Sequence, residues 1–126
     1  MRGKWHIYPE MAAAGLWTTP SDLARFAISL QNGYAGQSNP VISQSMIRQM
    51  LTRQKENSGL GLGLAGSGKT LRFFHDGRND GFDAFLLAYA ESGTGAVIML
   101  NANDDSGAVG RIVDAVSKEY HWGGAE

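Results

Sequence analysis

The segment of residues 71–103 constrains the fold of this chain more than any other, because it combines long apolar runs with a concentrated polar cluster. Residues 82–89 carry apolar side chains at both odd and even positions, and residues 96–100 are apolar without a break. This is expected of central strands that are covered on both faces. A shorter apolar run, residues 71–74, precedes the polar cluster of residues 75–81. We therefore expect three successive strands that pair as an antiparallel meander, with the polar cluster at a strand end.

Glycine-containing breaks mark the turns of this meander. The pair Asp80-Gly81 supplies the positive φ that a tight reversal between two strands needs. Residues 91–94, Glu-Ser-Gly-Thr, form the second break. We interpret Asp76 and Asp80 as turn residues rather than as a paired acid and base, because aspartate favours turn positions.

Two helices are predicted before these strands. Thr19 followed by Pro20 is typical of a helix start, and Gly33 is a candidate C-terminal stop for that helix. A second helix should begin at Ser43, which can cap it, and should fade by Gln54. Both predictions rest on capping residues followed by apolar residues at helical spacing.

Three further segments complete the predicted fold. Glycine and leucine alternate over residues 59–64, so we expect a strand whose bare backbone face is closely approached by another element. Apolar residues recur at helical spacing over residues 109–120, and a residue of 104–106 should cap this last helix, which should cover one sheet face. Residues 1–15 show no period and are expected to be extended or irregular. The predicted class is α+β, an antiparallel sheet of about four strands with flanking helices.

The composition excludes several classes of function. The chain has 126 residues and a net charge of −1, and its basic residues form no stripe, so neither nucleic acid nor an anionic membrane surface is an expected partner. No apolar run approaches the roughly 20 residues of a membrane-spanning helix, and we expect no signal peptide. The absence of cysteine excludes disulfides and thiolate chemistry but leaves the compartment open.

The order of these features is similar to that of one known family. An apolar strand runs into His75-Asp76-Gly77 and is followed by a short turn, Gly-Phe, an apolar strand, a glycine turn, and an apolar strand that ends in Asn. Upstream, residues 11–33 contain Gly15-Leu16-Trp17-Thr18 just before a predicted helix, which is similar to a Gly-aromatic-x-Thr turn that leads into a helix. The chain thereby resembles the C-terminal part of the serine β-lactamase and penicillin-binding-protein superfamily, in particular its class C-like esterase and peptidase branch.

The resemblance implies roles for four consecutive residues, His75, Asp76, Gly77 and Arg78. In the family the third motif, Lys-Thr-Gly or its His-x-Gly variant, lies on the strand that lines the active site, and His75-Asp76-Gly77 matches the variant. It implies that His75 orients a substrate carboxylate or carbonyl, that Gly77 lets substrate approach the strand edge, and that the backbone N–H of Arg78 is an oxyanion-hole donor. Without the resemblance, the sequence predicts only that His75 ends a strand with a local hydrogen bond and that the Arg78 side chain faces solvent.

The family's first two motifs are missing from the sequence. No lysine has a serine three residues before it, and no tyrosine or serine has an asparagine two residues after it, so neither Ser-x-x-Lys nor Tyr-x-Asn is present. Acyl transfer to serine needs a nucleophile activated by an adjacent base. We therefore expect residues 1–126 to be one module, an incomplete domain equivalent to the C-terminal part of a β-lactamase-like hydrolase, with no complete catalytic set and no activity alone.

A P-loop nucleotide-binding protein is the first alternative function. The residues from Gly63 to Thr70 satisfy the Walker A pattern letter for letter. The mechanism needs a helix that opens at Lys69, so that its N-terminal amides meet the phosphates. The residues that follow are strand-like, so we prefer a flexible turn between two strands.

The second alternative is a non-catalytic module that oligomerises. In the family the sheet receives further strands and a helix from the N-terminal part of the domain, so an edge and an apolar face should lie open here. A second copy of the chain or the missing N-terminal part would cover them, and we expect a homo-oligomer. The complete domain acts on small acyl substrates, namely β-lactams, D-alanyl peptides or simple esters, and the sequence does not choose among them. No metal or other cofactor is expected, since the histidines lack ligand spacing.

Overall fold

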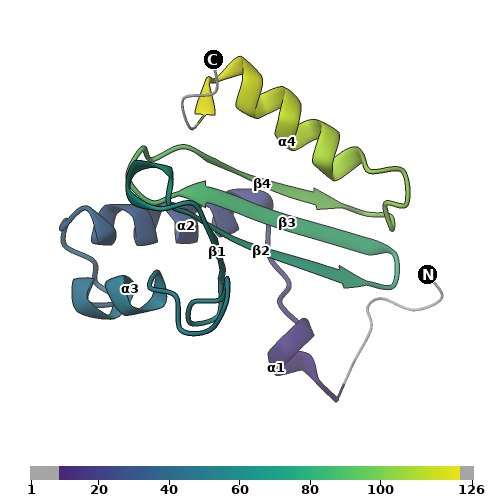
Figure 1. The fold of residues 1–126 in the computed structure, drawn as a ribbon. Coiled ribbons are helices and arrows are strands. Elements are labelled where there is room, and N and C mark those ends of the chain that lie inside the picture. The colour runs from purple at the N-terminus through teal and green to yellow at the C-terminus, as the bar shows by residue number, and fades with distance from the viewer. Residues whose placement is uncertain (1–8, 123–126) are drawn as a thin grey trace.

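The computed structural model describes residues 9–122, which form an antiparallel sheet with helices on both of its faces (Figure 1). In chain order the elements are α1 (Met11–Ala14), α2 (Pro20–Tyr34), α3 (Gln44–Met50), β1 (Gly63–Ala65), a 3-10 turn (Gly68–Thr70), β2 (Arg72–Asn79), β3 (Phe82–Tyr89), β4 (Gly95–Leu100) and α4 (Ala108–Glu119). The strands pair in the order β1-β2-β3-β4, so each is antiparallel to the next along the chain. The α+β class, the four strands and the flanking helices are confirmed.

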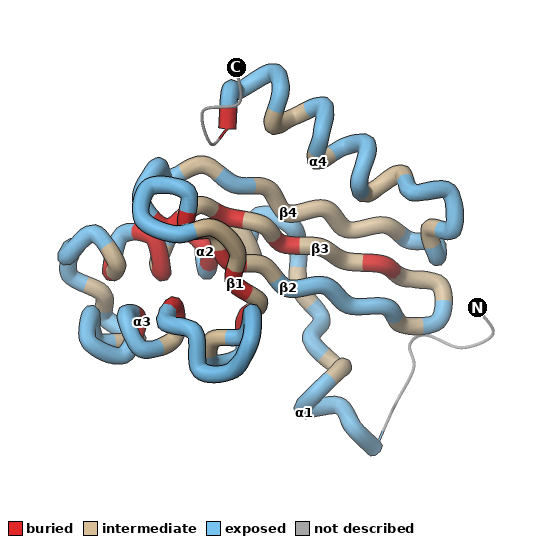
Figure 2. The backbone as a smooth tube through the Cα atoms, in the orientation of Figure 1, coloured by how far each residue is buried: buried red, intermediate tan, exposed pale blue. Residues whose placement is uncertain are grey.

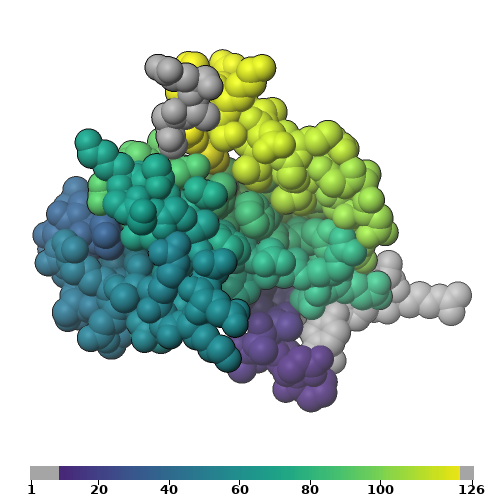
Figure 3. Space-filling model, viewed as in Figure 1, coloured from purple at the N-terminus to yellow at the C-terminus, as the bar shows by residue number. Residues whose placement is uncertain are grey.

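The hydrophobic core lies on one face of the sheet, which we call the core face. Helices α2 and α3 cover one end of this face. The fully buried side chains are Leu30 and Ile47 of these helices and Leu64 and Phe73 of the sheet. The opposite face carries α4, and Tyr89 of that face packs edge-on against Trp122 with 6.3 Å between ring centroids. In the space-filling view α4 and the segment around α1 lie on opposite sides of the strands (Figure 3). Burial is concentrated where α2 and α3 meet the sheet, and the end with the β2–β3 turn is more exposed (Figure 2).

Helix α2 begins as predicted but does not end as predicted. The Thr19 side chain accepts a hydrogen bond from the Asp22 backbone N–H at 3.1 Å, and Pro20 is the first helical residue. Gly33 is not the stop, because it lies inside the helix and is buried. A Cβ atom at Gly33 would collide with the Cδ1 methyl of Ile47, so the glycine allows α3 to pack closely against α2.

Helix α3 also begins at its predicted cap. The Ser43 hydroxyl accepts a hydrogen bond from the Met46 backbone N–H at 3.3 Å. The helix ends at Met50, before the predicted limit of Gln54. Ile47 is fully buried, Met50 packs against the core, and Arg48 donates to the Tyr34 carbonyl at 3.2 Å, so the helix is held against α2 and the core.

The predicted strand over residues 59–64 is wrong for most of its length. Only Gly63–Ala65 forms a strand, whereas Gly61 has a φ of +74° and Leu60 is 43% exposed. A left-handed glycine breaks the alternation that a strand needs. The expected close approach is present at Gly63, where a Cβ would lie 2.5 Å from the Phe74 ring.

The last strand is less covered than predicted, whereas the last helix has its predicted span and cap. Strand β4 was expected to be central, but it is the last strand of the sheet, and no strand in the described part of the chain pairs with its outer side. Helix α4 follows Gly107, and the Asp104 carboxylate accepts from the Val109 N–H at 3.0 Å. None of its residues, all of them described, is buried. The β4 and α4 side of the molecule is therefore only partly covered.

The N-terminal segment is partly helical rather than irregular. Residues 11–14 form one helical turn, and the rest of that prediction lies outside the described residues. Among the described helices, none is both long and apolar enough to span a membrane.

Candidate functional site

The four residues predicted from the family motif lie within strand β2, not in the turn after it. Arg72–Asn79 is one continuous strand, and its register places His75 opposite Leu86 and Arg78 opposite Asp83. The reversal takes place at Asp80-Gly81, where Gly81 has a φ of +79°. The polar cluster therefore lies at the end of β2, as predicted, but the interpretation of Asp76 as a turn residue is wrong, because the strand continues through it.

The second half of β2 has an open edge. Strand β1 pairs with β2 only as far as Phe74, so no strand among the described residues pairs with the outer side of residues 75–79. In an antiparallel ladder, residues alternate between bonding to one neighbour and facing the other way. The Ala90 N–H donates to the Leu71 carbonyl at 2.9 Å, and this pair continues the register of β2 and β3. The backbone groups of the odd-numbered residues of β2 therefore form hydrogen bonds with β3. The backbone N–H and C=O of Asp76 and Arg78 therefore point outward, along the open edge.

The side chains of the motif divide between the two faces. Successive side chains of a strand point to opposite faces. His75 and Gly77 share the core face with the buried Phe73, and Asp76 and Arg78 share the face that carries α4. No described atom lies within 4 Å of where a Cβ would stand on Gly77. The core face is therefore bare next to the open edge.

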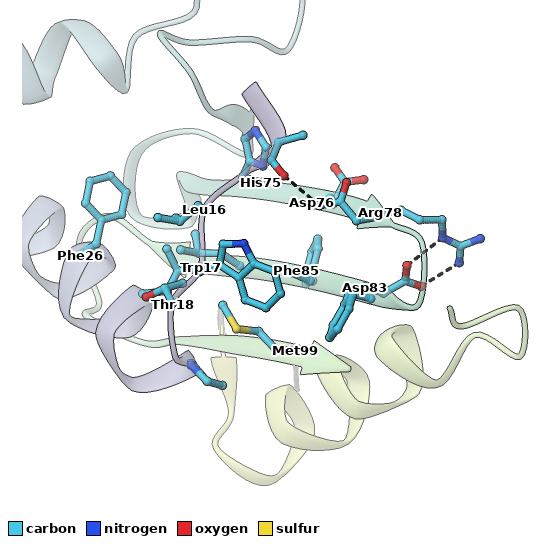
Figure 4. Close-up of a pocket in the computed structure, with 18 of the residues that line it drawn as sticks. Leu16, Trp17, Thr18, Phe26, His75, Asp76, Arg78, Asp83, Phe85 and Met99 are labelled. Atoms are coloured by element: carbon cyan, nitrogen blue, oxygen red, sulfur yellow. Dashed lines mark hydrogen bonds and ion pairs between the residues drawn. The ribbon is translucent and has the colours of Figure 1, made fainter. Parts of the chain in front are cut away.

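A groove of about 890 Å³ runs along this part of the core face (Figure 4). All four motif residues line it, together with the segment that precedes α2. Trp17 lies across the strands and packs edge-on against Phe82, with 6.1 Å between ring centroids. The Asn79 side chain donates to the Ala14 carbonyl at 2.8 Å, which ties that segment to β2. The apolar side chains of the groove wall include Leu16, Trp17, Phe26, Leu60, Phe82 and Met99.

The Arg78 side chain faces solvent over 53% of its area, and its guanidinium is also engaged by neighbouring carboxylates. Its Nε and Nη2 atoms donate to the two carboxylate oxygens of Asp83 at 2.8 and 2.7 Å. Its Nη1 atom donates to Asp105 at 3.0 Å, and Nη2 also donates to the Asp104 carbonyl at 2.9 Å. The hydrogen bonds from Arg78 lower the pKa of Asp83 to about 2, and the same contacts raise the pKa of Arg78. This pair clamps β2 to β3 and to the loop before α4.

Asn103 completes the clamp at the turn. Its side-chain amide donates to the Asn79 carbonyl at 2.8 Å and to Asp83 at 3.2 Å, and its oxygen accepts from the Gly81 N–H at 2.9 Å. The Asp104 N–H also donates to Asp83, at 2.7 Å. The β2–β3 turn and the loop after β4 are thereby held together beside the candidate site.

Two features of this region were missed in the sequence. Asp83 is the one charged residue in the apolar run of β3, and this exception was the available signal for a buried carboxylate that needs a partner. The position of Trp17 could not be predicted from the residues around it, because it contacts Phe82 of β3, which is far away in the chain. The groove wall therefore became visible only in the folded structure.

The arrangement of residues 63–70 does not support nucleotide binding. Gly68–Thr70 is a single 3-10 turn, and β2 begins at Arg72, so no α-helix opens at Lys69. The Thr70 hydroxyl donates to the Ser67 carbonyl at 2.9 Å, and this hydrogen bond closes the turn on itself. Phosphate binding of the P-loop kind needs an α-helical N-terminus.

The groove brings together a strand edge but not a nucleophile. The described residues that line it include no serine, lysine or tyrosine. No group of three or more histidine, aspartate or glutamate side chains that could hold a metal ion occurs within residues 9–122. The geometry is that of an open strand edge with outward backbone donors, beside an apolar groove.

Comparisons with known proteins point to one family. The sequence model of the Beta-lactamase family matches residues 2–117. The search of curated proteins and the search of solved structures gave no significant match. The family match spans most of the chain, and the four-stranded antiparallel sheet with flanking helices is compatible with it. This chain belongs to the Beta-lactamase family.

Proposed function

We propose that the open edge of β2 is the substrate-binding wall of a β-lactamase-like serine hydrolase. The observation that carries the proposal is the direction of the Arg78 N–H, which faces outward beside the groove. A fixed N–H at such an edge can stabilise the charge that develops on a carbonyl oxygen during acyl transfer. Gly77 leaves room for the acyl group, and His75, on the core face, can donate to a substrate oxygen.

The clamp supports this proposal because it fixes the backbone that carries the donor. Arg78 is held through two hydrogen bonds to Asp83 and one to Asp105. An oxyanion donor is effective when its position is fixed before the reaction. In this proposal the Arg78 side chain has a positioning role, on the face away from the groove.

We further propose that the isolated chain is catalytically inactive, because the sequence has neither Ser-x-x-Lys nor Tyr-x-Asn. The purified chain should not hydrolyse a chromogenic β-lactam or a nitrophenyl ester faster than buffer. A fluorophosphonate probe should label no serine stoichiometrically, with an active serine hydrolase as the positive control. Labelling of one serine, lost when the chain is denatured first, would contradict the proposal.

A homo-oligomer is the second proposal, and the partly covered β4 and α4 side favours it. The Tyr89 N–H donates to the Thr94 carbonyl at 2.9 Å, and this pair continues the register of β3 and β4. The backbone groups of the even-numbered residues of β4 therefore bond to β3, and those of the odd-numbered residues face outward. The strand has no charge and no proline, the usual means of blocking an edge. Ile112 and Tyr120, beside it, are 40% and 69% exposed. Association would bury these groups.

Val97→Pro tests this association. The Val97 N–H faces outward, so proline there removes a donor of the open edge without breaking the bonds to β3. We expect light scattering to show at least a dimer for the natural chain and for Val97→Ala, and a monomer for Val97→Pro with an unchanged circular dichroism spectrum. A natural chain that is monomeric at all accessible concentrations would refute the association.

A further inference from the structure

The segment between α1 and α2, residues 15–18, forms one wall of the groove, and we call it the strap. The groove is lined by these four residues on one side and by residues of β2, β3 and β4 on the other. Figure 4 shows Leu16, Trp17 and Thr18 on the strap, with Trp17 in front of the strands. The width of the groove therefore depends on where the strap lies.

Hydrogen bonds do not hold the middle of the strap in place. No hydrogen bond between described residues involves Leu16, Trp17 or Thr18. Leu16 is 78% exposed and Trp17 is 59% exposed, so neither side chain is fixed by burial in the core. A segment with few buried contacts and no hydrogen bonds of its own moves at low cost in free energy. The strap therefore needs an anchor outside itself.

The Asn79 side chain is this anchor. It donates to the carbonyl of Ala14, the residue before the strap, at 2.8 Å, although the two residues are 65 positions apart in the chain. The contact between Trp17 and Phe82 lies beside this hydrogen bond, because Asn79 and Phe82 are paired in the register of β2 and β3. One hydrogen bond and one aromatic contact thus hold the strap at the same point of the sheet.

The sheet is itself held in place at this point. The Asn103 amide donates to the Asn79 carbonyl at 2.8 Å, and the Asn103 oxygen accepts from the Gly81 N–H at 2.9 Å. The backbone of Asn79 is therefore part of the clamp, while its side chain holds the strap. The β2–β3 turn gives the strap a fixed support.

From this arrangement we infer that Asn79 is a positioning residue, whose side chain latches the strap so that Trp17 stands as a preformed wall of the groove. The inference rests on the proposed function of the groove and adds what fixes its second wall. Without the hydrogen bond, the strap spends part of its time away from Phe82, and a ligand then meets the sheet alone. By linkage, a ligand that contacts Trp17 favours the latched strap.

Asn79→Asp tests the latch without a ligand, because a carboxylate at neutral pH cannot donate to the Ala14 carbonyl. In NMR spectra of the full chain, we expect the NOE between Trp17 and Phe82 to lose most of its intensity. A soluble gadolinium chelate should broaden the Trp17 indole N–H signal more than in the natural chain. Asn79→Ala, which adds no charge, should give the same two changes. A contact between Trp17 and Phe82 that persists in both variants would overturn the inference.

The matched control is Asn57→Asp, which makes the same change at an exposed asparagine outside the groove. It should leave the NOE and the broadening unchanged. Urea unfolding of each variant, with m equal to that of the natural chain, shows that the variants share one folded state. A loss of the NOE in Asn57→Asp as well would show that the effect does not come from the latch.

Benzyl alcohol, a neutral aromatic probe, tests whether the latch matters for binding. The Met99 methyl lies in the groove and reports its occupancy by NMR. Asn79→Asp should weaken binding by roughly fivefold, the factor expected when one hydrogen bond that positions a wall is lost. In a Trp17→Ala background Asn79→Asp should have no further effect, because Asn79 acts through Trp17. Equal weakening in both backgrounds would refute this role.

The outcomes separate this inference from the proposed function. The Trp17 signals report the latch whether or not the edge of β2 binds an acyl substrate. Release of Trp17 in Asn79→Asp with unchanged probe binding, or no probe binding to the natural chain, would refute the strap as a binding wall. Probe binding that depends on the latch, together with labelling of a serine, would support the inference and refute only the proposed inactivity.

Discussion

The close contact between Gly33 and Ile47 predicts that Gly33→Ala destabilises the natural chain but stabilises a chain that carries Ile47→Val. In the natural chain Gly33→Ala places a methyl against the Cδ1 atom of Ile47, which is fully buried and cannot move aside freely. Overpacking of this kind costs about 1–3 kcal/mol, and alanine in a helix interior recovers about 1 kcal/mol relative to glycine. We expect a net loss of stability of up to about 2 kcal/mol.

Ile47→Val should reverse the effect, because it removes the atom that collides. Alone it costs about 0.5–1.5 kcal/mol as a loss of one buried methyl group. In the Ile47→Val background, Gly33→Ala should stabilise by up to about 1 kcal/mol, because the propensity gain remains without the collision. The coupling between the two sites is then about 1–3 kcal/mol.

Urea unfolding of the four proteins measures this coupling, with equal m values as the check on a common unfolding transition. Gly110→Ala is the matched control, because Gly110 also lies inside a helix and no described atom lies within 4 Å of its Cβ position. It should stabilise equally in both backgrounds. A stabilising Gly33→Ala in the natural background, with coupling below about 0.5 kcal/mol, would show that Gly33 is not needed for close packing.

Three further changes test the clamp, the turn and the helix cap. The folded pKa of Asp83, about 2, lies below its ordinary value of 3.8, so its carboxylate stabilises the fold above that value and the contribution is lost as the pH falls toward 2. Asp83→Asn should therefore lower the melting temperature near neutral pH and make the melting temperature depend less on pH between about 4 and 2. The same pH dependence in the variant and the natural chain would contradict the ion pair. Mg-ATP should leave the melting temperature unchanged, and saturable binding abolished by Lys69→Ala would restore the P-loop alternative. Thr19→Ala should cost about 1 kcal/mol in urea unfolding, and no loss would argue against the cap.

The sequence predicted the features that depend on neighbouring residues. Thr19 and Ser43 start their helices because a side-chain oxygen next to the chain reversal caps the nearby N–H groups. Asp80-Gly81 makes the tight turn because glycine adopts a positive φ without steric cost. These signals lie within a few residues of the structure that they determine.

The features that depend on distant residues were not predictable in the same way. Gly33 resembles a helix stop until its contact with Ile47 is known. His75–Asn79 continues a strand although it is polar, because only one of its edges is paired and much of it stays in contact with water. The groove and the clamp join Trp17 to β3 and Arg78 to Asp105, and no local pattern encodes either contact.

The two-residue turn between β2 and β3 has a consequence for how the family's genes can vary. The even residues of β2 face away from β3, because Arg72 and Phe74 pair with β1 on that side, and the length of the turn does not change this direction. Hairpin loops of three to five residues can close the same pair of strands as a two-residue loop. Residues inserted at this turn are therefore expected to lengthen the loop and to leave the Arg78 N–H at the open edge.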